Sequence, residues 1–188
     1  DHLSKFDDSL ARAVVWGAAW DAARDAETSA RDYVKLVLNN IATEDESTTI
    51  LILLRQLVTT GNLYVAKENR EETLIEIGDG LLALAREAAP GSDIQLQLVK
   101  FFTQFARTGA QLDALEQLLS GKLALAGLEI DADLRWEIIT GLVVGSRLDA
   151  ADIDTGHVGN FVSDLFARQG LLGGFFGQVD PAFNGLPT

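Results

Sequence analysis

Residues 66–107 read AKENREETLIEIGDGLLALAREAAPGSDIQLQLVKFFTQFAR. Apolar side chains recur there every three or four positions from Leu74 to Ala88, which is the spacing of one face of an α-helix. Pro90-Gly91 cannot continue that helix and predicts a turn. Ser92 and Gln95 then have the spacing of a capping box, which predicts a second helix through Arg107. The stretch therefore predicts two amphipathic helices joined by a short turn.

The same pattern recurs on both sides of this stretch. It predicts helices that start near positions 9, 30, 48, 66, 93, 110, 132 and 149. Ser29 with Asp32 forms another capping box, and Ser47 and Asp131 are predicted N-caps. Gly61 is expected to end the third helix. In the first helix, the predicted apolar stripe consists of Leu10, Ala13, Val14, Gly17 and Ala18.

Helix starts lie about 20 residues apart, so a helix pair recurs about every 40 residues. This is the period of two-helix repeats of the HEAT and armadillo kind, in which each pair buries its apolar face against its neighbours. We predict an all-α, HEAT/armadillo-like superhelix of antiparallel helix pairs over residues 1–154. A compact helical bundle is the alternative, although eight short helices exceed what a four-helix bundle needs.

Residues 155–188 differ in composition from the rest of the chain. Seven of the 17 glycines and five of the nine phenylalanines lie from Gly156 onward. Glycine costs a helix about 1 kcal/mol relative to alanine, so we predict a partly irregular Gly/Phe-rich tail. Two roles stay open for it. It can cover the end of the helical array, or it can dock on another chain, because an unburied Phe-rich patch is costly.

Composition excludes several function classes. The net charge of −13 argues against binding to nucleic acid or an anionic membrane, because both need a basic surface. No apolar run is long enough for a membrane span. The absence of cysteine excludes disulfides and thiolate metal sites and fits a reducing compartment, so a cytoplasmic location is expected. The absence of methionine leads us to expect a piece of a longer polypeptide.

No catalytic motif is recognisable in the chain. A zinc peptidase helix needs two histidines four residues apart with a glutamate between them, and the only histidines are His2 and His157. No Gly-Lys-Ser/Thr phosphate loop occurs. We therefore predict no catalytic residue, metal ligand or cofactor-binding residue in this chain.

Two tryptophan-containing segments are candidates for contact with a partner. Trp16, Trp20 and Arg24 recur every four residues on one helix face, and Asp21 can reach Arg24. One interpretation is a helix-packing stripe with a shielded ion pair. The other is an aromatic and charged surface that meets peptide. Arg135 and Trp136 allow the same two interpretations.

The same residues carry a resemblance to a known family. The stretch DSLARAVVWGAAWDAARDAE (8–27) resembles the C-terminal helical domain of bacterial aminopeptidase N, a gluzincin zinc metallopeptidase, in the form found in high-GC Gram-positive bacteria. Further matching segments are ARDYV (30–34), LLRQ (53–56), APGSD (89–93) and IDADLRW (130–136). The resemblance covers about Ser9 to Asp154, and the Gly/Phe-rich tail departs from it.

The resemblance implies an accessory domain without catalytic residues of its own. In that family a HEAT-like C-terminal domain encloses the peptide-binding cavity over the catalytic domain and supports release of N-terminal amino acids. It implies zinc in an upstream catalytic domain of the same polypeptide, with that domain and, indirectly, the peptide substrate as partners. The residues that we expect at the cavity or the interdomain contact are Trp16, Trp20, Arg24, Arg55, Arg135 and Trp136.

Two rival hypotheses come from other classes. The chain could be a stand-alone helical-repeat scaffold that binds a partner protein along one face. It could also be an independent hydrolase, which the lack of any histidine–carboxylate constellation argues against. Zinc retention or aminopeptidase turnover by the isolated chain distinguishes these hypotheses.

Overall fold

The computed structural model describes Leu3, Phe6 and residues 8–148. Within these residues the regular structure consists of seven α-helices and two short helical extensions, with no strand. The helices are α1 (Ser9–Arg24), α2 (Ala30–Asn40), α3 (Ser47–Thr59), α4 (Lys67–Glu87), α5 (Asp93–Phe105), α6 (Gly109–Leu119) and α7 (Ala132–Val144). A 3₁₀ turn, η2 (Ile41–Thr43), follows α2, and a π-helical turn, η3 (Thr60–Tyr64), follows α3.

The chain divides into two compact units, Asp1–Gly145 and Ser146–Thr188. The helices belong to the first unit, and the description below concerns that unit. The helix predicted to start near Asp149 and the tail over 155–188 lie outside the described residues.

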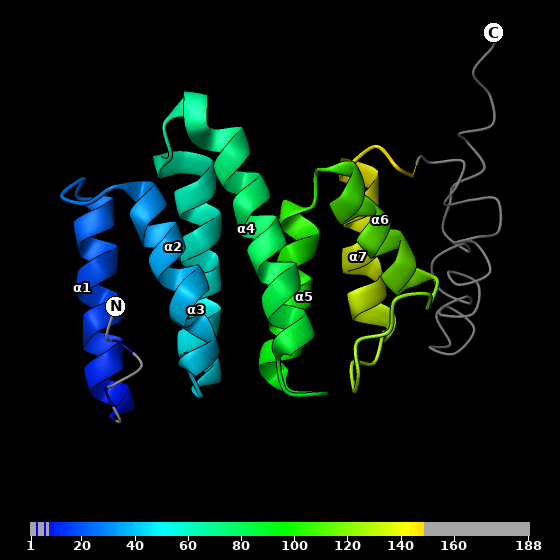
Figure 1. Cartoon of the computed structure of the whole chain (residues 1–188), viewed down its shortest axis with the longest axis horizontal. Helices are drawn as coiled ribbons and strands as arrows, with labels where there is room; N and C mark the ends of the chain where they lie inside the picture. The colour runs from blue at the N-terminus through cyan, green and yellow to red at the C-terminus, as the bar shows by residue number, and fades with distance from the viewer. Residues whose placement is uncertain (1–2, 4–5, 7, 149–188) are drawn as a thin grey trace, which may run out of the picture. The chain divides into compact units, whose positions relative to one another are not determined.

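Successive helices stack as antiparallel pairs (Figure 1). Each of the helices α2, α4 and α6 contacts the helix that follows it, and α4 with α5 is the most extensive of these contacts. Contacts also join every second helix, namely α2 with α4, α3 with α5, and α5 with α7. Contacts to the next helix and to the one after it are typical of a two-layer helical repeat. The predicted all-α repeat fold is confirmed, and these contacts favour it over a compact bundle.

The core lies between the two layers and is aliphatic and aromatic. In α4, Leu74, Ile77 and Leu81 are at most 4% exposed, as their helical spacing predicted. The facing side of α5 buries Phe102 and Phe105 almost completely. Burying a large apolar side chain contributes roughly 1.5–3 kcal/mol. Packing against neighbouring helices therefore stabilises each helix pair more than the helix propensity of its residues does.

Only some of the predicted helix caps form in the structure. The Ser92 hydroxyl accepts a hydrogen bond from the backbone N–H of Gln95, and the Asp131 carboxylate accepts one from that of Leu134, so both predicted N-caps are confirmed. The Gln95 side chain accepts from the backbone N–H of Gly91 and not from that of Ser92, so the predicted capping box is incomplete. The predicted Ser29 capping box is wrong, because the Ser29 side chain makes no capping hydrogen bond. Ser47 is the first helical residue rather than the N-cap, a position that Glu46 occupies.

Gly61 does not end the third helix, which corrects another prediction. The chain passes from α3 directly into η3, where Gly61 is buried. A Cβ at this position would lie 2.8 Å from Leu74 Cδ2 and 3.0 Å from Ile77 Cδ1. The glycine is thus needed for close packing of η3 against α4 and not for a left-handed cap.

A buried glutamine at the start of α6 joins the first helices of two successive pairs, α4 and α6. Thr108 and Gln111 form a complete capping box that sequence reasoning missed. The Gln111 amide nitrogen also donates to the Ile75 carbonyl oxygen (3.0 Å) and to Asp79 Oδ1 (2.7 Å) on α4. Gly78 makes room for this amide, since a Cβ there would lie 2.7 Å from Gln111 Nε2. This glutamine therefore fixes α6 against α4.

The predicted apolar stripe of α1 faces away from the core. Leu10 and Val14 are 70% and 65% exposed, while the buried side of α1 carries Arg12, Trp16 and Ala23. The physical reason is the carboxylate of Glu44, which is buried after η2 and binds Arg12 and Trp16. A hydrophobic pattern cannot reveal an ion-pair partner that lies 32 residues away.

Candidate functional site

Trp16 lies in the interior and holds α1 against the α2–α3 connection. Its indole Nε1 donates to Glu44 Oε1 at 2.8 Å. Arg12 Nε reaches both oxygens of the same carboxylate at 3.2 Å, and its guanidinium also donates to Asp45 Oδ1. A charge buried this deeply is stable only when it is paired and hydrogen-bonded. The position of Trp16 is that of a packing residue.

Trp20 lies one turn further along α1 in an aromatic cluster. Its ring centroid is 5.5 Å from that of Tyr33 and 5.7 Å from that of Tyr64. The Tyr33 hydroxyl donates to Gln56 Oε1, and burial raises the pKa of this phenol well above its ordinary value of 10.0. Tyr64 is 38% exposed, so one edge of the cluster reaches the surface.

Arg24 and Arg55 lie at the surface. Arg24 forms ion pairs with Asp21 at 3.0 Å and Asp25 at 3.1 Å, which bears out the predicted Asp21 contact. The hydrogen bond to Asp25, followed by the charges of the two aspartates, raises the pKa of the Arg24 guanidinium. Arg55 is an exposed residue of α3. Such exposed ion pairs add little to stability, so Arg24 has no evident packing role.

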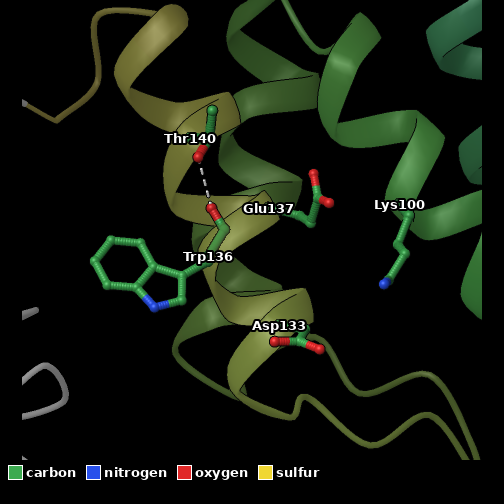
Figure 2. Close-up of a pocket in the computed structure, with 5 residues that line it drawn as sticks. All are labelled: Lys100, Asp133, Trp136, Glu137 and Thr140. Atoms are coloured by element: carbon green, nitrogen blue, oxygen red, sulfur yellow. Dashed lines mark hydrogen bonds between the residues drawn. The ribbon is translucent and has the colours of Figure 1, made fainter. Parts of the chain in front are cut away.

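Trp136 lines an open hollow between α5 and α7, together with Lys100, Asp133, Glu137 and Thr140. Figure 2 shows Lys100 of α5 on the side of Asp133 and Glu137, while the Trp136 indole extends in the opposite direction. The Thr140 hydroxyl donates to the Trp136 carbonyl oxygen at 2.8 Å. Arg135, the neighbouring candidate, is partly buried on α7.

Sequence reasoning identified Trp136 but missed the rest of this hollow. Positions 133, 136, 137 and 140 follow helical spacing along one side of α7, which is the signal that could have found three of them. Lys100 comes from another repeat and has no such signal. The hollow has a volume of about 400 Å³ and is lined by side chains of both charges, which suits polar groups of a peptide chain rather than an apolar ligand.

The six predicted contact residues do not form a single site. Trp16, Trp20 and Arg24 lie on α1, while Arg135 and Trp136 lie on α7 at the other end of the row of helices (Figure 1). In the part of the chain that the structure describes, no three His, Cys, Asp or Glu side chains are grouped to hold a metal ion. No helix there has the length and apolar character to cross a membrane.

Stacked antiparallel helix pairs place the chain in the class of α-helical repeat domains. Residues 1–156 match the family model of the ERAP1-like C-terminal domain. Over 153 residues, which make up 81% of the chain, the sequence is 39% identical to aminopeptidase N of Streptomyces lividans. The matched part spans 18% of that relative's length. The chain thus belongs to the ERAP1-like C-terminal domain family, and it is a C-terminal domain of the kind found in aminopeptidase N-like proteins.

Proposed function

We propose that the chain is the accessory C-terminal domain of a zinc aminopeptidase of the aminopeptidase N type. In this role it encloses the peptide-binding cavity over a catalytic domain of the same polypeptide. The observation that carries the proposal is the family match over residues 1–156. The 39% identity to aminopeptidase N of Streptomyces lividans supports it. A cytoplasmic location is part of the proposal.

The mechanism of such a domain is enclosure. A wall of packed helices around a cavity excludes folded proteins and long chains, and it shields a bound peptide from bulk water. The buried hydrogen bonds of Gln111 and Glu44 suit this task, because each of them holds one helical repeat against another. Zinc in the catalytic domain would supply the Lewis acid and the activated water.

The α5–α7 hollow is the surface of this chain that we place toward peptide or the catalytic domain. It is lined by side chains of both charges and by Trp136, and the charged groups can pair with the carboxylates and ammonium groups of a peptide. The exposed edge of the Trp20 aromatic cluster, with Arg24 near it on α1, is the second such surface. Trp136 and Arg24 are therefore the first positions to vary in the complete enzyme.

Zinc content and peptidase activity of the isolated 188-residue chain test the proposal against its rivals. We expect less than about 0.1 zinc per chain after dialysis and no release of amino acid from an aminoacyl amide, because the chemistry belongs to the catalytic domain. Stoichiometric zinc or measurable turnover would establish an independent hydrolase. A native polypeptide that contains this chain but no His-Glu-x-x-His motif would favour the stand-alone scaffold.

A further inference from the structure

The α5–α7 hollow holds charges of both signs that do not pair with one another. Lys100 reaches it from α5, and Asp133 and Glu137 reach it from α7 (Figure 2). Within residues 8–148 none of these three side chains forms an ion pair, although Lys100 and Glu137 are half-buried. A half-buried charge has lost part of its hydration, so a partner of opposite charge stabilises it.

The two carboxylates are placed to share the positive charge of a ligand. Asp133 and Glu137 are four residues apart on α7, so they lie one turn apart on the same side of the helix. Like charges at this spacing destabilise a helix, and a cationic ligand beside them removes the repulsion. Lys100 lies on the other wall of the hollow, where its ammonium group can bind an anionic group of the same ligand.

We propose that the α5–α7 hollow is a binding site for a free basic α-amino acid, such as arginine or lysine. The hollow presents two carboxylates and one ammonium group, and a basic amino acid carries two cationic groups and one carboxylate. The α-carboxylate of the ligand pairs with Lys100, and its two cationic groups pair with Asp133 and Glu137. The volume of about 400 Å³ lies within the range of small-ligand pockets.

Other ligand classes fit the hollow less well. An apolar ligand finds little to contact, because the Trp136 indole extends away from the charged groups (Figure 2). A phosphate or a dicarboxylate is repelled by the two carboxylates. A peptide N-terminus lacks the free α-carboxylate, and a peptide C-terminus lacks the α-ammonium group. Binding itself needs only this chain, whereas the identity of the amino acid as a product of the parent enzyme rests on the proposed function.

Titration of the 188-residue chain with arginine, followed by NMR of the backbone amides, tests the proposal. Amides of residues 133–140 should shift, with a Kd of roughly 1–10 mM at low ionic strength and about pH 6. Arginine amide, which mimics a peptide N-terminus, lacks the carboxylate that Lys100 binds. N-acetylarginine, which mimics a peptide C-terminus, lacks the α-ammonium group. Each of the two should bind at least about threefold more weakly than arginine.

Two substitutions separate the roles of the two walls. Lys100→Gln should weaken arginine binding about threefold or more without weakening that of arginine amide, because arginine amide has no carboxylate for Lys100. Glu137→Gln should weaken both ligands. Glu137 is chosen over Asp133, since Asp133 lies in the first turn of α7 and also stabilises that helix end. The matched controls are Lys35→Gln and Glu68→Gln, exposed charges on α2 and α4, which should change neither ligand.

Three outcomes would overturn the proposal. General attraction to a chain of net charge −13 favours arginine amide over arginine, so equal or tighter binding of the amide would show that no such site exists. Equal binding of N-acetylarginine would assign the hollow to a peptide C-terminus. The third outcome is the absence of shifts at residues 133–140 when arginine is present at ten times the expected Kd. These titrations use no catalytic domain, so their failure is distinguishable from failure of the proposed function.

Discussion

Single buried polar residues determine how the helices of this chain meet. Tyr33, Glu44 and Gln111 are each at most 6% exposed, and each is hydrogen-bonded to a helix or connection other than its own. A buried polar group without a partner costs about 1–3 kcal/mol, so each of these residues favours one arrangement of its neighbours over all others. Substitutions at such positions should therefore have larger effects than substitutions on the acidic surface.

Tyr33 should make the chain less stable at alkaline pH. Burial raises its pKa in the folded state above the ordinary 10.0, so above pH 10 the unfolded chain loses this proton while the folded chain keeps it. The unfolded state then binds fewer protons, and the free energy of unfolding falls as pH rises, by up to about 1.4 kcal/mol per pH unit. Below pH 10 the Tyr33 phenol is protonated in both the folded and the unfolded state, so it lowers the free energy of unfolding only above that pH.

Urea unfolding between pH 9 and 11.5 measures this effect. Tyr33→Phe should flatten the alkaline decline, while at pH 7 it should cost only about 1 kcal/mol for the lost hydrogen bond to Gln56. Tyr64→Phe, at the exposed edge of the same aromatic cluster, is the control. Equal slopes for Tyr33→Phe and the unmodified chain would show that the Tyr33 phenol is not shielded from water.

Two glycines in helix interiors should respond in opposite ways to alanine. At Gly17 a Cβ has open space, so Gly17→Ala should stabilise the 188-residue chain by about 0.5–1 kcal/mol through helix propensity. At Gly78 a Cβ would displace the Gln111 amide from Ile75 and Asp79. Gly78→Ala should therefore destabilise the chain by about 1–2 kcal/mol despite the better propensity. Chemical denaturation of the two variants is the measurement, and changes of equal sign would contradict this account.

Helix ends offer a matched pair of cap substitutions. The Thr108 hydroxyl accepts a hydrogen bond from the backbone N–H of Gln111 within a full capping box. The Ser29 side chain makes no capping hydrogen bond. Thr108→Ala should lower the free energy of unfolding by about 1 kcal/mol, and Ser29→Ala by less than about 0.5 kcal/mol. Equilibrium unfolding in urea tests the difference. A larger loss at Ser29 would mean that the α2 cap forms in solution.

The helices themselves could be predicted from the sequence because their signals are local. The apolar stripe of α4, the turn at Pro90-Gly91 and the Asp131 cap lie within a few residues of the elements that they define. Which side of α1 is buried could not be predicted, because the deciding carboxylate of Glu44 belongs to another element. Lys100 was missed at the α5–α7 hollow for the same reason, since α5 and α7 meet only after folding.

The described helices α1–α7 combine a packed helical repeat with surfaces that suit the contacts proposed above. Neighbouring repeats of α1–α7 are joined by aliphatic packing and by buried polar contacts. The contacts that we propose with a catalytic domain and with peptide lie at exposed or half-buried positions, where the apolar pattern of the sequence gives no signal. Family membership and not residue spacing therefore directs the functional proposal.

Enclosure is tested most directly by the length dependence of peptide cleavage in the parent enzyme. The ratio of kcat/KM for a short peptide to kcat/KM for a long one should be measured with and without the segment that corresponds to residues 1–156. We predict that removal of the segment leaves zinc bound and lowers this ratio by about tenfold or more, equivalent to about 1.4 kcal/mol of discrimination. An unchanged ratio with zinc retained would contradict the account.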